Sequence, residues 1–274
     1  MISPNASAPE PAREFAIQAR DAGKLFLDGT VVAFRNLNLS VKKKELLCIV
    51  GPSGCGKTTF LRAIAGLTQI STGSLIVNGA EVKGPPDGVA TVFQHFGLLP
   101  WKTVWDNAAF GLAMRAEKAA IIRERVGHYL DLAGLNGFEK HYPYQLSGGM
   151  QQRVGLVRAL SMNPSILLMD EPFAALDAQT REVLQEELIA LMGRPDERMA
   201  MVFITHSIDE AIILGDRIAI MSARPGRIKD IIELDFGWPR DVDAIRADRR
   251  FTELREHIWN ELRPERVKTM EAVA

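Results

Sequence analysis

The sequence is poor in cysteine and has no excess of charge of either sign. Its two cysteines, Cys48 and Cys55, lie in an apolar run and in a glycine-rich loop, where a disulfide would distort the loop. We therefore expect both thiols to be reduced, as is usual in a cytoplasm. The 33 basic and 34 acidic residues leave a net charge of −1. This balance provides no overall electrostatic reason to bind nucleic acid or an anionic membrane surface.

Long hydrophobic runs are also missing. The apolar run at residues 199–204 is far too short to span a bilayer. Residues 1–14 are rich in proline, alanine and serine and lack the apolar segment of a secretory signal, so we predict a disordered tail there. What the sequence does have is apolar content: 47% of the 274 residues are hydrophobic, which is enough for a substantial core.

Residues 51–58, Gly-Pro-Ser-Gly-Cys-Gly-Lys-Thr, match the pattern G-x-x-x-x-G-K-[ST]. An apolar run at 46–50 precedes them and helix-forming residues 58–65 follow, which is the strand–loop–helix setting that the pattern requires. Glycines allow successive backbone N–H groups to point at one anion, and the helix N-terminus adds partial positive charge. The segment therefore predicts a phosphate cradle, with an ordinary strand-to-helix turn as the alternative.

Side chains in this loop and in a later strand predict a phosphorylated ligand held with a metal ion. Lys57 is expected to reach the outer phosphates, and the Thr58 hydroxyl to ligate Mg²⁺. Residues 166–171 read as a buried strand that ends in Asp170 and Glu171. Because ligands gather at the carboxyl ends of parallel strands, Asp170 is predicted to hold Mg²⁺ and Glu171 to polarise an attacking water. The alternative is a strand that ends in solvated acids.

Residues 146–154, Leu-Ser-Gly-Gly-Met-Gln-Gln-Arg-Val, predict a second helix terminus that binds an anion. Ser147 is expected to cap a helix whose first turn is opened by Gly148 and Gly149. Since one nucleotide already has its phosphates in the first loop, this terminus is explained if it closes over a nucleotide bound to another copy of the chain. An ordinary capped helix, the alternative, does not call for two adjacent glycines.

The order of the predicted elements indicates an α/β fold. Residues 15–49 alternate in short segments and are predicted to form antiparallel strands, and Asn78-Gly79 predicts a hairpin turn. Helical periodicity places an inserted helical subdomain at about residues 96–160. Strands and helices then alternate over residues 166–221, which predicts a mostly parallel sheet with helices on both faces.

No internal repeat is present, so we predict one nucleotide-binding domain at residues 15–236, followed by a helical extension at 237–274. A stripe on one face of the last helix is formed by Phe251, Leu254, Ile258 and Leu262. Packing of this stripe against the same domain is the favoured interpretation, and a partner-binding helix is the alternative.

Together these motifs resemble the ATP-binding subunit of an ABC transporter. The matching features run from about Phe26 in the family's usual order, and they comprise the loop at 51–58, Gln94, residues 146–149, Asp170-Glu171, residues 175–177 and His206. The resemblance implies a P-loop NTPase (RecA-like) fold in which the N-terminal antiparallel strands and the helical subdomain flank the parallel sheet. It also implies ATP and Mg²⁺ as cofactors and ATP hydrolysis as the activity.

The resemblance further implies roles for single residues. Phe26 is expected to stack on adenine, where tyrosine is commoner, although it also suits a strand core. Gln94 is expected to sense Mg²⁺ and the attacking water, Asp177 to lie at a dimer seam, and His206 to contact the γ-phosphate. Catalysis is assigned to Lys57, Gln94, Glu171 and His206, and the metal to Thr58, Gln94 and Asp170. The expected nucleotide contacts are Phe26, Gly51, Pro52, Ser53, Gly54, Cys55, Gly56, Lys57, Thr58, Thr59, Ser147, Gly148, Gly149 and Asp177.

Two positions depart from the family pattern. Met150 stands where glutamine is most familiar, and Lys44 replaces a common glycine; neither change removes a phosphate-binding amide.

The Cys55 thiol lies at a helix N-terminus beside Lys57, conditions that lower a cysteine pKa. We therefore expect thiol reagents to block ATPase activity and ATP to protect.

Residues 96–101, Phe-Gly-Leu-Leu-Pro-Trp, resemble the nitrate, sulfonate and taurine importer branch of the family, as do residues 224–227, Arg-Pro-Gly-Arg. The resemblance implies integral membrane permease subunits and a second copy of the chain as partners, indirect contact with a substrate-binding protein, and a peripheral location on the cytoplasmic face of the inner membrane. Trp101 and Trp105 suit either core packing or an interface with the permease. A soluble or lipid-transport ABC ATPase remains the alternative to a solute importer.

Overall fold

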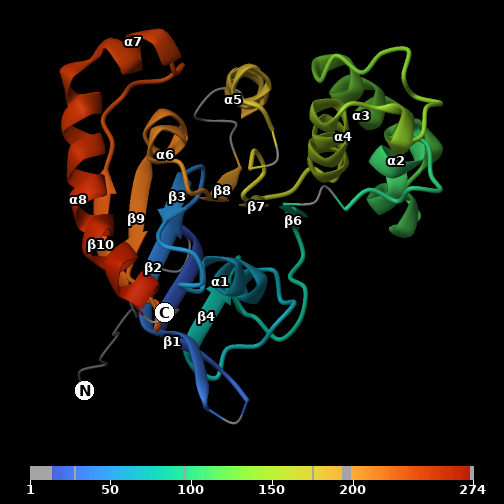
Figure 1. Ribbon diagram of the computed structural model, residues 1–274. Coiled ribbons are helices and arrows are strands. Elements are labelled where there is room, and N and C mark those ends of the chain that lie inside the picture. Colours follow the sequence, from blue (N-terminus) through green and yellow to red (C-terminus); the bar gives the residue numbers. More distant parts are fainter. Residues whose placement is uncertain (1–13, 28, 95–96, 175, 193–198, 272–274) are drawn as a thin grey trace, which may run out of the picture.

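A central sheet of six strands organises the molecule, in the order β10-β9-β3-β8-β7-β6. The computed structural model describes residues 14–27, 29–94, 97–174, 176–192 and 199–271 (Figure 1). Neighbouring strands pair in parallel except for β10 at the edge, which is antiparallel to β9. The strands are β3 (Leu46–Val50), β6 (Val89–Val92), β7 (Ile166–Asp170), β8 (Ala200–Ile204), β9 (Arg217–Met221) and β10 (Ile228–Glu233).

The central strands are continuous apolar runs because both faces of the sheet are covered. In β3, the side chains of Leu46, Cys48 and Val50 enter one core, and those of Leu47 and Ile49 enter the core on the opposite face. This alternation follows from the period of two along a strand. The prediction that antiparallel strands extend to residue 49 is therefore wrong for β3, which pairs in parallel with β8 and β9.

A second sheet of four strands, in the order β2-β1-β4-β5, is antiparallel as predicted for the N-terminal region. It consists of β1 (Phe15–Phe26), β2 (Val31–Lys42), β4 (Thr72–Val77) and β5 (Ala80–Glu81). Asn78 and Gly79 join β4 to β5 with φ values of 50° and 80°. Both lie in the left-handed region that a two-residue hairpin turn requires, so the predicted hairpin is confirmed.

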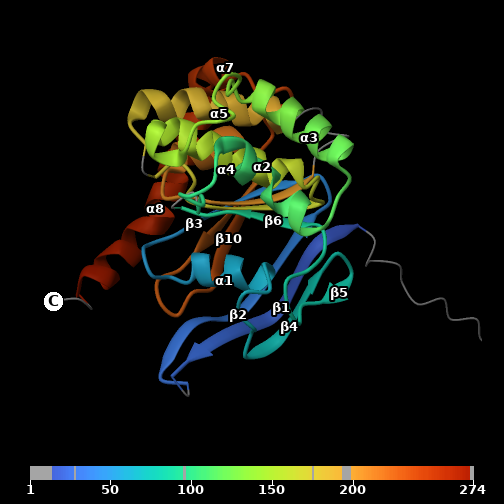
Figure 2. The same ribbon diagram turned by 90° about the vertical axis from the view of Figure 1, so that its right-hand side faces the viewer.

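Helices cover both faces of the central sheet, as predicted. Helix α1 (Lys57–Ile64) lies between the central sheet and the antiparallel sheet (Figure 2). Its Phe60 and Ile64 side chains belong to the core that also holds the antiparallel sheet. On the other face lie α5 (Ala178–Met192) and α6 (Ile208–Leu214), whose apolar residues pack with the opposite side chains of the same strands. The phosphate-loop helix is thus fixed between two sheets.

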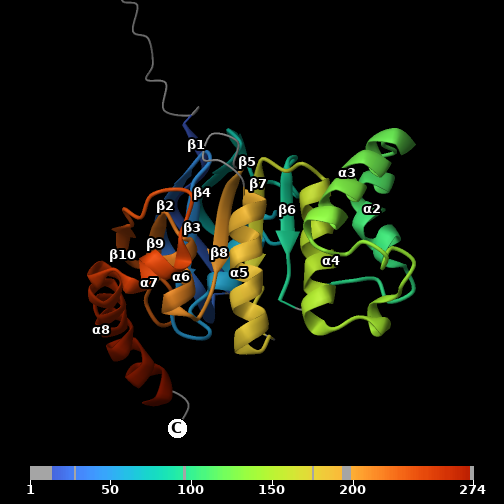
Figure 3. The same ribbon diagram turned by 90° about the horizontal axis from the view of Figure 1, so that it is seen from above.

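The inserted helices stand at one side of the molecule, beyond β6 (Figure 3). They are α2 (Val104–Met114), α3 (Ala119–Leu132) and α4 (Gly148–Ser161), with a short 3-10 turn at Pro143–Gln145. These helices share a core of their own, and α4 also sends Leu156 and Leu160 into the main core. Because α4 belongs to both cores, it links the helical region to the central sheet.

Two helices end the described chain, α7 (Val242–Ala247) and α8 (Arg249–Glu271). Phe251, Ile258 and Leu262 are buried in the main core, and Leu254 packs against it. This confirms that the stripe packs against its own chain. The predicted tail at residues 1–14 lies outside the described residues except for Glu14, and the domain boundaries stay a prediction. Within the described chain, no helix combines the length and apolarity needed to cross a bilayer.

The backbone at Lys44 adopts a conformation that favours glycine. Lys44 has a φ of 65° in the turn between β2 and β3. The left-handed conformation costs a residue with a Cβ roughly 1–2 kcal/mol and costs glycine almost nothing. The departure noted in the sequence therefore reduces stability slightly and lies away from the phosphate loop.

Candidate functional site

The glycine-rich loop connects the carboxyl end of β3 to the first turn of α1. Gly56, the residue that precedes the helix, has a φ of 100°, and a Cβ there would lie 2.8 Å from the carbonyl oxygen of Ala33. Only glycine accommodates both the conformation and the close approach. The helix therefore starts with its free N–H groups directed into the loop, which is the arrangement that binds an anion.

Lys57 is held inside this loop. Its side chain is only 4% exposed, and its ammonium group donates hydrogen bonds to the carbonyl oxygens of Gly51 at 2.8 Å and Pro52 at 3.1 Å. A buried ammonium needs such partners because its desolvation is costly. The same group therefore both closes the loop and places a positive charge where a phosphate would enter.

Thr58 and Asp170 meet although they are far apart in the sequence. The Thr58 hydroxyl donates to Oδ1 of Asp170 at 2.9 Å. Burial raises the pKa of Asp170, the Thr58 hydrogen bond lowers it, and the neighbouring Glu171 charge raises it again. Hydroxyl and carboxylate oxygens are the hard ligands that Mg²⁺ prefers, and together with phosphate oxygens they suit a divalent cation. These residues therefore fit the implied metal.

Glu171 and His206 form the second polar pair of the site. His206 Nε2 lies 2.6 Å from Oε1 of Glu171. Burial lowers the pKa of His206, the Lys57 charge lowers it further, and Glu171 opposes both effects. The imidazole is therefore neutral at neutral pH and donates its Nε2 hydrogen to the carboxylate. Glu171 has a φ of 48°, a left-handed conformation that is rare outside glycine and concentrates at functional sites.

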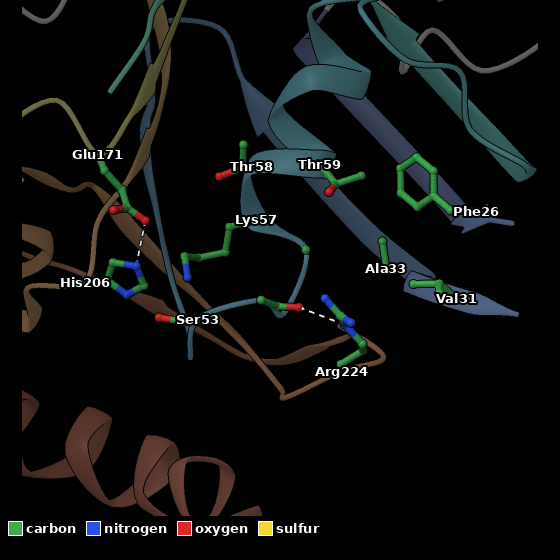
Figure 4. A pocket seen from close by; sticks show the side chains of 12 residues that line it. Phe26, Val31, Ala33, Ser53, Lys57, Thr58, Thr59, Glu171, His206 and Arg224 are labelled. Atoms are coloured by element: carbon green, nitrogen blue, oxygen red, sulfur yellow. Dashed lines mark hydrogen bonds and ion pairs between the residues drawn. The ribbon is translucent and has the colours of Figure 1, made fainter. Parts of the chain in front are cut away.

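Except for Asp170, these groups line one cavity of about 350 Å³, which lies within the usual range for small-ligand sites (Figure 4). Phe26 stands at one end of the cavity with its ring partly exposed, and the Glu171–His206 pair stands at the other. The lining residues are Phe26, Val31, Ala33, Ser53, Gly54, Gly56, Lys57, Thr58, Thr59, Glu171, His206 and Arg224. The aromatic ring at one end suits the base of a nucleotide, and Lys57 with the glycine-rich loop, between Phe26 and the Glu171–His206 pair, suits its phosphates.

Three of these lining residues were missed by the sequence reasoning. Val31 and Ala33 come from β2, and Arg224 comes from the turn between β9 and β10. The Arg224 Nε donates to the carbonyl oxygen of Gly54 at 3.3 Å, and Figure 4 shows this contact. The sequence singled out residues 224–227 only as a mark of the importer branch. No signal in the sequence placed that turn against the phosphate loop.

Several predicted residues do not line this cavity. Gln94 is exposed and follows β6, the strand that pairs with β7, so it lies at the same edge of the sheet as Asp170. Ser147 and Asp177 are exposed at the starts of α4 and α5. Ser147 caps α4 as predicted, accepting a hydrogen bond from the Met150 N–H at 3.3 Å. Within a single chain, Gln94, Ser147 and Asp177 therefore do not line the cavity at the phosphate loop, although they are expected to contribute to the same nucleotide site.

The prediction of a reactive Cys55 rests on a pKa direction that the structure contradicts. The side chain is 1% exposed, and burial raises the pKa of the thiol by more than Lys57 and the neighbouring backbone N–H groups lower it. The sequence showed the helix terminus and the lysine but not the core that covers the sulfur. Cys48 is also buried, and neither cysteine is in a disulfide in the structure.

We now expect Cys55 to be protected in the folded protein. A buried, protonated thiol reacts more slowly than a free one because the thiolate is the nucleophile and the reagent must reach it. At pH 7 a disulfide reagent should label Cys55 about a hundredfold more slowly in the native protein than after unfolding in guanidinium. The rate in the native protein is limited by how often the fold opens locally. Mass mapping of the labelled peptide measures this ratio. Equal rates in the two states would restore the original prediction.

The sequence is similar to one family of proteins. The family model described as ABC transporter matches residues 34–174. An uncharacterized ABC transporter ATP-binding protein of Methanocaldococcus jannaschii is 47% identical over 245 residues, which is 89% of this chain and 90% of that protein. The aliphatic sulfonates import ATP-binding protein SsuB of Bacillus thuringiensis subsp. konkukian is 41% identical over 230 residues, 84% of this chain and 88% of that protein. The taurine import ATP-binding protein TauB of Jannaschia sp. is 41% identical over 233 residues, 84% of this chain and 86% of that protein.

The fold is similar to that of a solved ATP-binding cassette, a dimer in a post-hydrolysis state bound to ADP and Pi. The TM-score is 0.69 at 32% sequence identity, and the match covers 80% of this chain and 98% of that one. The chain therefore belongs to the ABC transporter family. It is an ATP-binding subunit that hydrolyses ATP, and its fold is the predicted P-loop NTPase fold.

Proposed function

We propose that this chain powers the import of a small anion or organic solute, of the nitrate, sulfonate or taurine type, through separate permease subunits. The similarity to the sulfonate and taurine import subunits over most of the chain supports this branch. Trp101, in the segment that marks the branch in the sequence, is 71% exposed, whereas Trp105 packs on the helical core. An exposed tryptophan suits a contact with a permease subunit at the cytoplasmic face of the membrane. In this proposal a substrate-binding protein interacts with the chain only indirectly, through the permease.

The chain acts as a head-to-tail dimer of identical copies in this proposal. The observation that supports the dimer is that the predicted nucleotide-binding residues lie in two separate places on one chain. The phosphate loop, Glu171 and His206 line one cavity, while Ser147 and Asp177 are exposed elsewhere. A second copy brings Ser147, Gly148 and Gly149 to the nucleotide held in the loop of the first, with Asp177 at the seam. ATP then joins the two copies through its γ-phosphate, and hydrolysis releases them.

Within each half-site the residues divide the work. Phe26 stacks on the base, Lys57 and the loop N–H groups bind the phosphates, and Thr58 and Asp170, with Gln94, would hold Mg²⁺. When bound, the metal offsets charge on the phosphate oxygens. Glu171 accepts a proton from the attacking water or orients it. The neutral His206 imidazole has one N–H, which it donates to the Glu171 carboxylate; we expect this N–H to turn to the γ-phosphate once ATP is bound.

The test of the proposal is purification of the tagged chain from its native membranes in mild detergent, followed by identification of the proteins that accompany it. A multi-spanning permease is the expected partner, and the binding protein encoded with it should bind a sulfonate, taurine or nitrate by calorimetry. Intact ATPase activity without any membrane partner would instead indicate a soluble ABC ATPase. A permease whose binding protein binds none of these solutes would contradict only the assignment to this importer branch, and the role as a transport ATPase would stand.

Arg224 is expected to contribute to ATP binding. Its guanidinium lies at the mouth of the cavity and contacts the loop at Gly54, so Arg224→Ala removes both a cation and a loop contact. Since the side chain is exposed, we expect ATP affinity to fall only about fivefold. Titration calorimetry with ATP measures the change. Arg227→Ala, which alters an exposed residue of the same turn outside the cavity lining, is the control, and equal affinities for the two variants would contradict the role.

A further inference from the structure

A buried carboxylate lies behind His206, outside the set of residues assigned to the reaction. Glu210, in the first turn of α6, is 5% exposed, and Thr205 and Gln185 beside it are 3% exposed. The Thr205 hydroxyl donates to Oε2 of Glu210, and the Gln185 amide donates to Oε1 at 3.3 Å. Desolvation raises the pKa of Glu210, against the effect of these hydrogen bonds. Burial of a carboxylate is costly, so its position calls for a reason.

Helix capping does not supply that reason. Ser207 already caps α6, because its hydroxyl accepts a hydrogen bond from the Glu210 N–H at 3.2 Å. The carboxylate of Glu210 instead holds the loop before the helix. Thr205, which donates to Glu210, also accepts from the Ser207 N–H at 2.9 Å. Glu210 thereby ties together the residues on both sides of His206.

The same carboxylate reaches the start of α5. Arg181 Nε lies 3.7 Å from Oε1 of Glu210, and another nitrogen of that guanidinium donates to the Leu176 carbonyl oxygen at 3.0 Å. Leu176 precedes Asp177, which caps α5 by accepting from the Thr180 N–H at 2.9 Å. A chain of contacts therefore joins the His206 loop to the segment proposed to lie at the dimer seam.

A second cavity, of about 280 Å³, lies along this chain of contacts. It is lined by Glu171, Ala174, Arg181, Thr205, His206, Ser207 and Glu210. Glu171 and His206 also line the nucleotide cavity, so the pair forms the wall between the two. Because this second cavity is open space, few side chains pack closely against His206 on the side that faces Glu210. Polar contacts through Thr205 and Ser207, rather than a tight core, must then fix where the imidazole lies.

We propose that Glu210 is a positioning residue for ATP hydrolysis: through Thr205 and Ser207 it fixes His206 at hydrogen-bonding distance from Glu171, and through Arg181 it couples this pair to the Asp177 segment. The inference rests on the role proposed for His206. It predicts that loss of the Glu210 carboxylate lowers turnover without weakening nucleotide binding, because none of the phosphate-binding groups contacts it. It also predicts that the loss disappears once His206 is gone.

The experiment is a double-mutant cycle on the full chain with Glu210→Gln and His206→Ala. Glu210→Gln keeps the size of the side chain and turns one acceptor oxygen into a donor. We expect kcat to fall about tenfold and the ATP dissociation constant to stay within about twofold. In the His206→Ala background the same change should lower kcat no further. Thr205→Val, which removes the bridging hydroxyl at nearly constant volume, should reproduce the kcat loss and provides the test if Glu210→Gln folds poorly.

The matched control is Glu45→Gln. Glu45 is also buried and ion-paired, with Arg217 Nη1 at 2.8 Å, but it precedes β3 and lies at the opposite end of the sheet from the phosphate loop. Its replacement should lower the melting temperature and leave kcat unchanged. Wild-type turnover in folded Glu210→Gln, or an equal loss with and without His206, would overturn the positioning role. Wild-type turnover in His206→Ala would instead contradict the role proposed for His206 itself.

Discussion

Glu171→Gln is expected to bind ATP and to hydrolyse it about 10²–10⁴-fold more slowly than the wild type. The substitution keeps the size of the side chain and its contact with His206, but it removes the negative charge that polarises water. Loss of a well-placed base or charge-stabilising group at a reacting centre typically slows turnover by about 10²–10⁴-fold. Because hydrolysis is what opens the proposed dimer, the variant should accumulate as a closed dimer in ATP.

Phosphate release in a single turnover measures the rate, and light scattering after size exclusion in ATP measures the dimer. A third readout follows from electrostatics. Glu171 raises the pKa of His206, so its neutralisation should lower that pKa further, and the imidazole should stay neutral to a lower pH. Histidine side-chain NMR checks this direction. Glu186→Gln, an exposed acid on α5, is the control. Wild-type turnover in Glu171→Gln would exclude the assigned role.

Lys57→Ala is expected to abolish ATP binding at ordinary concentrations. The buried ammonium is the only lysine nitrogen among the described residues that line the cavity, and it also closes the loop through Gly51 and Pro52. A charged group that pairs with phosphate in a partly desolvated site contributes about 2–5 kcal/mol, which corresponds to a loss of at least about thirtyfold in affinity.

Thermal unfolding with and without ATP is the measurement. Saturating ATP should stabilise the wild type by about 2.7 kcal/mol at a hundred times its dissociation constant. At the same ATP concentration, Lys57→Ala should gain no more than about a third of that stabilisation. Lys57→Met separates charge from packing, because it keeps most of the aliphatic stem. An ATP-dependent shift of wild-type size in Lys57→Met would show that the positive charge is not needed.

Much of the site was predictable because its parts are local in sequence. The phosphate loop needs glycines at fixed spacing between a strand and a helix, and the Ser147 cap needs only its own helix. Asp170 and Glu171 were identified by their position at the end of a buried strand. In the structure Thr58 bonds to Asp170 and Glu171 lies beside His206. These contacts follow from parallel strands whose carboxyl ends share one edge of the sheet.

The amino-acid sequence by itself therefore determined the family and the ATPase activity, and it predicted the groups that contact the phosphates, since short motifs carry this information. Tertiary structure alone decided which groups are desolvated and which distant segments meet. Burial reversed the expected pKa shift of Cys55, the turn that carries Arg224 reached the loop, and Glu210 came to lie behind His206. Desolvation and contacts between distant segments depend on how the whole chain packs, so a local pattern of residues does not contain them.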